Sequence, residues 1–232
     1  GVDFAGKRVG QIGTGSTGIQ AAPVIAAEAG HLTVFQRTAN YSVPAQNKPL
    51  TPEFKARVRD NWAEIRAVMH STLNGHPFTI EDRSVHDVSD AELKAMLERA
   101  WQVGGLQFRA NFRDVLTDET ANAKLAEFVK DKIRSIVRDP ATAERLADID
   151  HPYAAKRPPI DSFYFEAFNR DNVALVDVRE DPIQRITPTG IRLQSGREFA
   201  LDIIVFATGY DAMTGPLMGL NITGAGGRTL AK

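Results

Sequence analysis

The chain has 232 residues, of which 43% are hydrophobic, and its 28 basic and 29 acidic side chains give a formal net charge of −1. This length suffices for one large domain or two small ones with a buried core. A balanced charge provides no overall field that would attract nucleic acid or an anionic membrane. The absence of cysteine excludes disulfides, a thiol nucleophile and thiolate metal ligands. The five histidines show no metal-ligand spacing, so no metal site is predicted.

Signals that would direct the chain to a membrane are also missing from the sequence. No apolar run approaches the roughly 20 residues of a membrane-spanning helix, and the first residues do not resemble a signal peptide. We therefore expect a cytoplasmic protein without nucleic-acid or membrane partners. The sequence opens at Gly1 almost directly on its first predicted strand and stops at Lys232 without a clear capping element, so we expect a piece of a longer protein.

A glycine-rich turn joins a predicted strand over residues 9–12 to a predicted helix over residues 16–29. The turn reads Gly13-Thr14-Gly15-Ser16-Thr17-Gly18, which is the dinucleotide-binding pattern GxGxxG. In this pattern the first glycine permits the tight turn, the second lets the backbone approach a pyrophosphate, and the third lets the helix pack close to the strand. The unpaired N–H groups at the helix start suit phosphates. The sequence thus predicts a nucleotide site, and the alternative is an ordinary glycine-rich turn.

The residues after the second predicted strand, 32–35, indicate which nucleotide binds. An NAD site expects a carboxylate about 20 residues past the glycines, where it holds the ribose 2′-hydroxyl. This chain places Gln36, Arg37 and Thr38 there. Arg37 can pair with a 2′-phosphate through its planar fork, and the Thr38 hydroxyl can add a hydrogen bond. NADP(H) is therefore predicted over NAD(H), whereas a solvated surface arginine is the alternative.

From residue 51 to residue 147 the apolar residues recur at helical spacing. Helix starts are marked by Thr51 before Pro52, by a capping box at Ser89 and by Asp139 before Pro140. The aromatic residues of this span are predicted to lie in the core rather than to form a ligand site: Trp62, Trp101, Phe108, Phe112 and Phe128.

Strands return after residue 170. They are predicted over residues 173–178, 183–186, 191–193 and 202–207, and the last is a continuous apolar run typical of a buried parallel strand. We therefore predict an α/β fold, a Rossmann-like dinucleotide-binding domain formed by residues 1–50 and 148–232. A helical insertion over residues 51–147 interrupts it. Because the ligand crevice of such a sheet lies beyond the carboxyl ends of its strands, Gly15, Arg37 and Thr208 are predicted to share one crevice.

A basic pair, Lys156 and Arg157, precedes two prolines. The residue before a proline is pushed out of the helical region, so Arg157 is expected to be extended. Successive side chains of an extended segment point to opposite sides. The two cations could therefore serve two different anions, and a solvated pair on a loop is the alternative.

Five segments together resemble the type I Baeyer–Villiger monooxygenases, in order and spacing, over essentially the whole chain. They are GVDFAGKRVGQIGTGSTGIQ, HLTVFQRTANYSVPA, YAAKRPP, FNRDNVALVDV and IIVFATGYDAMTG. The resemblance implies the NADPH-binding domain with its helical insertion. Enzymes of this family hold FAD, reduce it with NADPH, and use O₂ to insert one oxygen atom beside a ketone carbonyl, which gives an ester or lactone.

The resemblance also implies roles for individual residues. Arg37, Thr38 and Lys156 would hold the 2′-phosphate of NADPH, while Thr208 and Gly209 match a second glycine turn near the two cofactors. Arg157 matches the family's active-site arginine, whose permanent charge stabilises anionic groups during oxygen insertion. Gly13, the first glycine of the turn, would also belong to the cofactor site. The residues after it would wrap the pyrophosphate: Thr14, Gly15, Ser16, Thr17, Gly18, Ile19 and Gln20.

Some motifs of the family are not in this sequence. They are the FAD-binding GxGxxG, the fingerprint Phe-x-Gly-x-x-x-His-x-x-x-Trp-Pro and the C-terminal FAD-domain segment. We therefore expect FAD to be bound mainly by segments outside this sequence, and the isolated chain to be inactive. Three alternatives stay open: a fragment of a flavin N- or S-oxygenase, which the Lys156–Arg157 pair disfavours; a non-catalytic NADP-binding module; and a Rossmann methyltransferase, which would not need Arg37.

Overall fold

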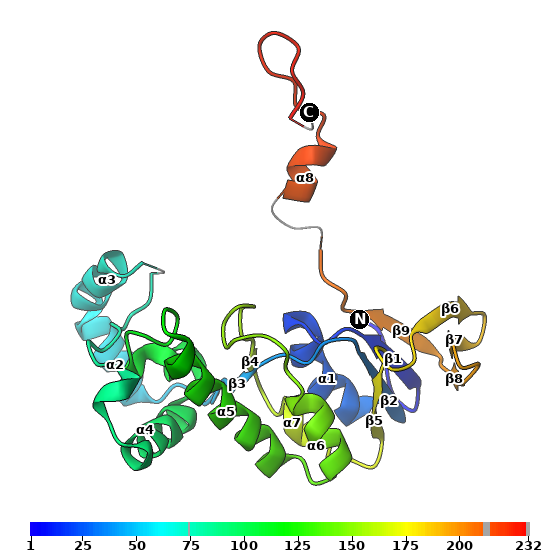
Figure 1. The fold of residues 1–232 in the computed structure, drawn as a ribbon, viewed down its shortest axis with the longest axis horizontal. Helices are drawn as coiled ribbons and strands as arrows, with labels where there is room; N and C mark the ends of the chain where they lie inside the picture. The colour runs from blue at the N-terminus through cyan, green and yellow to red at the C-terminus, as the bar shows by residue number, and fades with distance from the viewer. Residues whose placement is uncertain (74, 211–213, 231–232) are drawn as a thin grey trace.

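A four-stranded parallel sheet is the centre of the computed structural model, which describes residues 1–73, 75–210 and 214–230. Its strands lie in the order β5-β2-β1-β9 (Figure 1). Their bounds are Arg8–Ile12 for β1, His31–Gln36 for β2, Val173–Asp177 for β5 and Ile203–Phe206 for β9. The predicted α/β, Rossmann-like class is confirmed, because β1 pairs in parallel with both β2 and β9.

The first crossover follows from the pattern of the sequence. Helix α1 (Ser16–Glu28) connects β1 to β2 and turns Ile19, Ala22 and Ala26 toward the core. Five of the six residues of β2 are buried, which is typical of an inner parallel strand. Short apolar side chains on the helix let it approach the sheet closely, so the turn before it lies directly at the end of β1.

Helices occupy most of residues 52–147 and lie beside the sheet (Figure 1). The predicted caps are confirmed: Thr51, Ser89 and Asp139 each accept a backbone N–H with their side chains. The helices are α2 (Pro52–Asp60), α3 (Trp62–Ser71), η1 (Val85–Asp87), α4 (Asp90–Val103), η2 (Gly105–Asn111), α5 (Glu119–Ile136) and α6 (Pro140–Ala147).

The prediction that Trp62 is a core residue was wrong, because its side chain is 51% exposed. Helical periodicity shows that one face of a helix is apolar, but it does not show what covers that face. Here the helix breaks at Asn61 into α2 and α3, and neither helix buries a residue. Trp101, Phe108 and Phe112 are buried as predicted, and Phe128 packs against them half-buried.

Two smaller sheets and two short helices complete the fold. Strand β3 (Val43–Pro44) pairs in parallel with β4 (Ile160–Asp161), and α7 (Tyr164–Ala167) follows. Three antiparallel strands form a meander: β6 (Ile183–Thr187), β7 (Gly190–Leu193) and β8 (Glu198–Ala200). Helix α8 (Thr214–Gly219) and residues 220–230 stand away from the sheet in Figure 1. The segment Asp211–Met213, which contributed to the family resemblance, lies outside the described residues.

The core has one large and one small part. A single cluster joins Val9 and Ile19 to residues of α4–α7, whereas a smaller cluster between the sheet and the meander contains Phe35 and Ile191. The expectation that β9 is buried was wrong: among the described strands it pairs with β1 alone, and Phe206 is 62% exposed. The proposed division of the chain near residues 50 and 148 stays a prediction.

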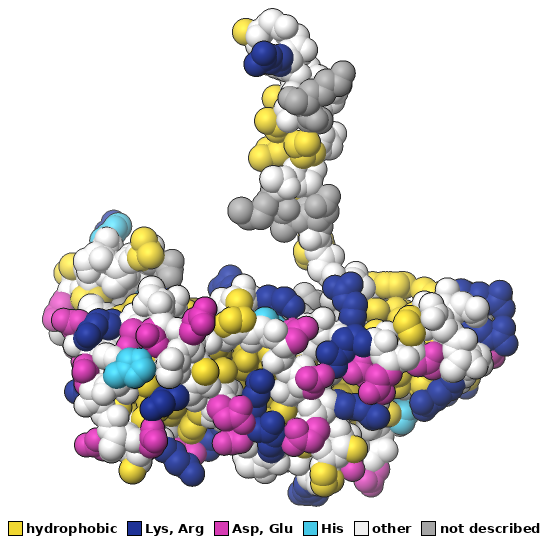
Figure 2. Space-filling view, viewed as in Figure 1, with side chains coloured by type: hydrophobic (Ala, Val, Ile, Leu, Met, Phe, Trp, Pro, Cys, Tyr) yellow, Lys and Arg dark blue, Asp and Glu magenta, His cyan; other side chains and the backbone are white. Residues whose placement is uncertain are grey.

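Basic and acidic side chains are interspersed over the face seen in Figure 2. In the described part of the chain, no helix combines the length and apolar character that crossing a membrane requires.

Candidate functional site

The glycine turn is wedged between the ends of β2 and β9. Its Gly13 donates its N–H to the Phe35 carbonyl (3.1 Å) and has a φ of +107°. A Cβ built on Gly13 would lie 2.4 Å from the Ala207 carbonyl oxygen, and one on Gly18 would lie 2.3 Å from the Gly13 carbonyl oxygen. No real Cβ contact is that short, so both positions require glycine if the turn is to keep its shape.

The N-terminus of α1 faces open space. Its N-cap residue Gly15 supplies no side-chain hydrogen bond, and the first turn contains no acidic residue. A Cβ built on Gly15 meets no atom within 4 Å, while Ser16 and Thr17 are exposed. The first N–H groups of an α-helix lack partners within the helix, and they carry the positive end of its dipole. This end of α1 therefore fits an anionic group such as a pyrophosphate.

The end of β2 is joined to the glycine turn. The Thr14 hydroxyl donates to the Thr38 carbonyl (2.8 Å), and the Thr38 side chain itself is half-buried. Gln36 is buried and donates its Nε2 to the Arg145 carbonyl (2.8 Å), so its side chain holds α6 rather than facing solvent. Arg37 is exposed, and none of the ion pairs found between described residues includes it. Its guanidinium is thus free to bind an anion.

The basic pair lies on the loop that leads into β4. Lys156 and Arg157 are both exposed, and neither belongs to an ion pair within the described ranges. Two contacts tie this loop to α1 and to β3. Val43, six residues after Arg37, donates its N–H to the Pro159 carbonyl (3.1 Å), and Gln20 of α1 donates its Nε2 to the Ile160 carbonyl (3.0 Å).

Two other predicted pyrophosphate contacts use their side chains elsewhere. The Gln20 amide is the link between α1 and β4, and the Ile19 side chain is 1% exposed in the core. Only the backbone of Ile19 could then face a ligand. The roles assigned to both residues stay predictions.

The second glycine turn adjoins the first. Ala207 donates its N–H to the Ile12 carbonyl (2.8 Å), and its own carbonyl is the group that would collide with a side chain at Gly13. Thr208 and Gly209 follow directly, are exposed, and Gly209 has a φ of +89°. The fold therefore brings the glycine turn and the ends of β2 and β9 to one edge of the sheet, while the β3–β4 pair attaches the basic loop to the segment that follows β2.

Sequence reasoning missed a buried polar residue beneath this edge. Gln11, in the middle of β1, is fully buried and donates its Nε2 to the Gly13 carbonyl (3.2 Å). Its Oε1 is buried and has no hydrogen-bond partner among the described residues. The available signal was a polar side chain in an otherwise apolar strand. The Gln11 side chain also lies against Gly18, because its Nε2 is 3.0 Å from the position that a Cβ of residue 18 would occupy. Gln11 thus supports the turn from below.

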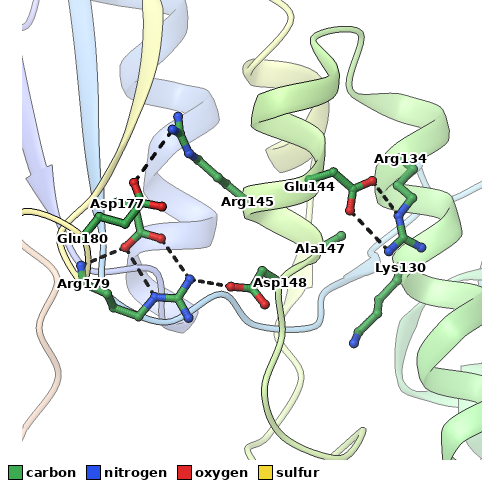
Figure 3. Close-up of a pocket in the computed structure, with 9 residues that line it drawn as sticks. All are labelled: Lys130, Arg134, Glu144, Arg145, Ala147, Asp148, Asp177, Arg179 and Glu180. Carbon is green, nitrogen blue, oxygen red and sulfur yellow. Dashed lines mark hydrogen bonds and ion pairs between the residues drawn. The ribbon is translucent and has the colours of Figure 1, made fainter.

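A charged cavity of about 680 Å³ opens beyond the carboxyl end of β5 (Figure 3). Four basic and four acidic side chains line it, and none of them belongs to the predicted site. Arg179 pairs with Asp177 (2.9 Å) and with Asp148 (2.7 Å), so it connects β5 to the end of α6. Burial opposes ionisation of Asp177, but hydrogen bonds from Arg179 outweigh it and lower the pKa of that carboxyl. The cavity is a network of mutually paired charges.

No protein-family model matches the chain. Two similar proteins are cyclohexanone 1,2-monooxygenase from Acinetobacter sp., with 45% identity over 97% of this chain, and phenazine N-monooxygenase from Lysobacter antibioticus, with 38% identity over 99% of it. A solved structure, that of an oxidised steroid monooxygenase bound to NADP, superposes with a TM-score of 0.93 at 50% identity and covers 99% of this chain. The chain spans 42% of the length of both relatives and 44% of that structure.

Proposed function

Because the chain is homologous over nearly its whole length to part of the Baeyer–Villiger monooxygenases, we propose that it is the NADPH-binding portion of such a flavin-dependent enzyme. The complete cytoplasmic enzyme would convert a ketone to an ester or lactone with O₂ and NADPH. One observation carries the proposal: the start of α1 is uncapped, and Arg37, Lys156 and Arg157 are exposed and form no ion pair with any described residue. That combination suits a ligand with a pyrophosphate and a further phosphate.

NADPH would lie across the edge of the sheet. The backbone N–H groups of Gly15, Ser16 and Thr17 would bind its pyrophosphate, where the dipole of α1 favours negative charge. Arg37 and Lys156 would bind the 2′-phosphate. An arginine suits this task because its planar fork can donate two hydrogen bonds to one phosphate.

FAD would be held mainly by other segments of the enzyme and, when bound, would supply the redox chemistry with NADPH and O₂. Arg157 would supply a fixed positive charge on the side of the loop opposite Lys156. A guanidinium stays protonated at any working pH, so it would stabilise negative charge that develops while oxygen is transferred to the ketone. Thr208 and Gly209, exposed beside the first glycine turn, would let the backbone approach the cofactors.

The substitution Arg37→Ala tests the cofactor assignment. Loss of a charge-assisted contact of about 1.5–3 kcal/mol should weaken NADPH binding about ten- to a hundredfold and leave NADH binding nearly unchanged. Titration calorimetry on the full-length enzyme measures both. The control is Arg185→Ala, which removes an equally exposed arginine from the β6 strand of the meander. Equal losses of NADPH and NADH affinity in Arg37→Ala would contradict the assignment.

Product analysis separates the proposal from oxygenation of nitrogen, which the name of the Lysobacter relative makes the strongest rival. Supplied with a cyclic ketone, an N-heteroarene and NADPH, the full-length enzyme should form the lactone. Arg157→Ala should leave reduction of the flavin largely intact and abolish lactone formation. An N-oxide as the main product would favour the rival, and a reading frame without a flavin domain would favour a non-catalytic module. Preference for S-adenosylmethionine in a nucleotide screen would favour a methyltransferase.

A further inference from the structure

The loop that carries Lys156 and Arg157 is bracketed by two backbone conformations that non-glycine residues rarely adopt. Ala154 has a φ of +66° and Phe163 a φ of +69°. Each such residue costs free energy and persists only where its surroundings hold the chain in place. The contacts at the two ends of the loop show what holds it.

A buried asparagine holds the beginning of the loop. Asn122, on α5, is 9% exposed and forms three hydrogen bonds. Its Oδ1 accepts the Tyr153 N–H (2.8 Å), while its Nδ2 donates to the Tyr153 carbonyl (2.9 Å) and to the Val115 carbonyl (2.8 Å). Both backbone groups of Tyr153 are therefore bound by one side chain. The Tyr41 hydroxyl adds a bond to the His151 carbonyl (2.9 Å).

A buried carboxylate holds the end of the loop. Asp161 is 5% exposed, and it accepts the Ser42 hydroxyl (2.5 Å) and the Tyr164 N–H (3.0 Å). Burial raises the pKa of its carboxyl, although these hydrogen bonds act in the opposite direction. No described cation forms an ion pair with it. A buried carboxylate without a cation is costly, so its presence calls for a geometric reason.

Both ends of the loop are attached to one short segment, residues 40–45. Tyr41 binds the beginning at His151, and Ser42 binds the end at Asp161. Ala45 also donates its N–H to the Asp161 carbonyl (2.7 Å). This segment follows Arg37 and Thr38 directly in the sequence. The place of the basic pair relative to Arg37 is thus set by contacts over a few residues on each side.

We propose that Asn122 and Asp161 are positioning residues, which fix the loop of residues 154–160 so that Lys156 stands beside Arg37 at the phosphate site. Neither side chain would touch the cofactor. The inference rests on the proposed function, in which Lys156 binds the 2′-phosphate. It adds that the selectivity for NADPH depends on two buried side chains remote from that phosphate.

The test compares NADP⁺ and NAD⁺ binding in the full-length flavoprotein. In Asn122→Ala and in Asp161→Ala, the affinity for NADP⁺ should fall about tenfold, while the affinity for NAD⁺ should stay within about twofold, since only NADP⁺ carries the 2′-phosphate. A second readout is independent of ligands and of activity. Trypsin should cut after Lys156 about tenfold faster in both variants, because a released loop opens more often. The bond after Arg157 precedes a proline and resists trypsin.

Three further variants control for a general loss of stability. Leu125→Ala leaves a cavity on the same helix as Asn122 and removes none of the hydrogen bonds that hold the loop, so it should change neither the NADP⁺/NAD⁺ ratio nor the rate of cleavage at Lys156. Asp161→Asn keeps an acceptor oxygen for the Tyr164 N–H and places an NH₂ donor opposite the Ser42 hydroxyl, which can accept it, so it should retain most of the selectivity. If Asp161→Ala does not fold, the NADP⁺/NAD⁺ affinity ratio and the rate of cleavage at Lys156 in Ser42→Ala and Asn122→Ala test the inference in its place.

Lys156→Ala separates this inference from the function on which it rests. If Lys156→Ala weakens NADP⁺ binding but the positioning variants change neither the ratio nor the cleavage rate, the inference is overturned. An equal loss of selectivity in Leu125→Ala would overturn it as well. If Lys156→Ala leaves NADP⁺ binding unchanged, the assigned role of Lys156 is wrong, and faster cleavage in Asn122→Ala would still support the attachment of the loop.

Discussion

Four helices of residues 52–147 differ from helix α1 at their N-termini. Helices α2, α4, α5 and α6 each begin with a side-chain oxygen that accepts a backbone N–H, from Thr51, Ser89, Asp118 and Asp139. Helix α1 begins at Gly15 and has no such acceptor. Every helix start has the same unpaired donors. Helix α3 also lacks a side-chain cap, so what distinguishes α1 is that its uncapped start follows the glycine turn, where a ligand can supply the acceptor.

The basic side chains of the helical region and of the edge of the sheet also differ in whether they have partners. Arg134 on α5 pairs with Glu127, Asp131 and Glu144, and the hydrogen bonds to Glu127 and Glu144 raise the pKa of its guanidinium. Arg37 has no such partner within the described residues. Paired cations support the fold, whereas the unpaired one at the edge of the sheet is available to a substrate or cofactor.

The largest effect is expected when the shape of the uncapped turn is changed. Gly13→Ala combines an unfavourable φ with a clash against the Ala207 carbonyl, which should destabilise the protein by about 4 kcal/mol. Urea unfolding of the variant measures the loss. Gly15→Ala is the matched control, since a Cβ there meets nothing within 4 Å. Similar stability losses in the two variants would show that the turn does not have the described close approach.

A cap added to α1 would remove the difference between the two regions directly. Gly15→Asp should offer the first turn an acceptor and raise stability by a few tenths of a kcal/mol. It should also repel a pyrophosphate and weaken NADPH binding about a hundredfold, or about 2.7 kcal/mol. Calorimetric titration and thermal unfolding measure the two effects. Unimpaired NADPH binding would mean that phosphates do not lie at this helix start.

Removal of a cap from the supporting helices should have a moderate effect on stability alone. Asp118→Ala deletes the acceptor for the Ala121 N–H (2.7 Å) at the start of α5 and should cost about 1 kcal/mol. NADPH affinity should be unchanged, because α5 is not part of the proposed phosphate site. A loss of affinity comparable to that of Gly15→Asp would argue against separate roles for the two kinds of helix start.

The smallest effect concerns the pairing of β1 with β9. Hydrogen bonds from Arg8, whose guanidinium lies 2.7 Å from Asp202, hold the pKa of the Asp202 carboxyl well below its usual range. A lowered pKa means that the stabilisation is complete above the ordinary value of about 4 and is lost as the pH falls below it. Asp202→Asn should therefore flatten the decline in stability on acidification. Unfolding midpoints measured from about pH 7 to about pH 3 would show this, and an unchanged decline would contradict it.

Local signals predicted much of the fold and named most residues of the candidate site. The strand, glycine turn and helix of residues 8–28 depend on neighbours in the sequence, and so do the caps at Thr51, Ser89 and Asp139. The positions of Arg37 and Thr208 followed from the rule that parallel strands end at one edge. For the glycine turn and the caps, the residues that determine the structure are close neighbours in the sequence.

What could not be predicted depends on contacts between distant residues. Ser42 and Asp161 are 119 residues apart, and Asn122 and Tyr153 are 31 apart. Strands β3 and β4 have two residues each, too few for a periodic pattern. Trp62 shows the same limit on a helix, because an apolar stripe does not reveal whether another element covers it.

The continuity of the large core has a consequence for how such proteins can diversify. One apolar cluster runs from Val9 beneath the glycine turn to Leu125 and Ile133 on α5, with Tyr41 and Tyr153 between them. A chimera that received residues 51–147 from a relative would inherit half of a shared interior. The side chains of the transferred residues would have to fit those of the rest of the core where the two meet. Otherwise voids and overlaps would form. Recombination is therefore restricted to parts that bury nothing, of which α2 and α3 are the clearest.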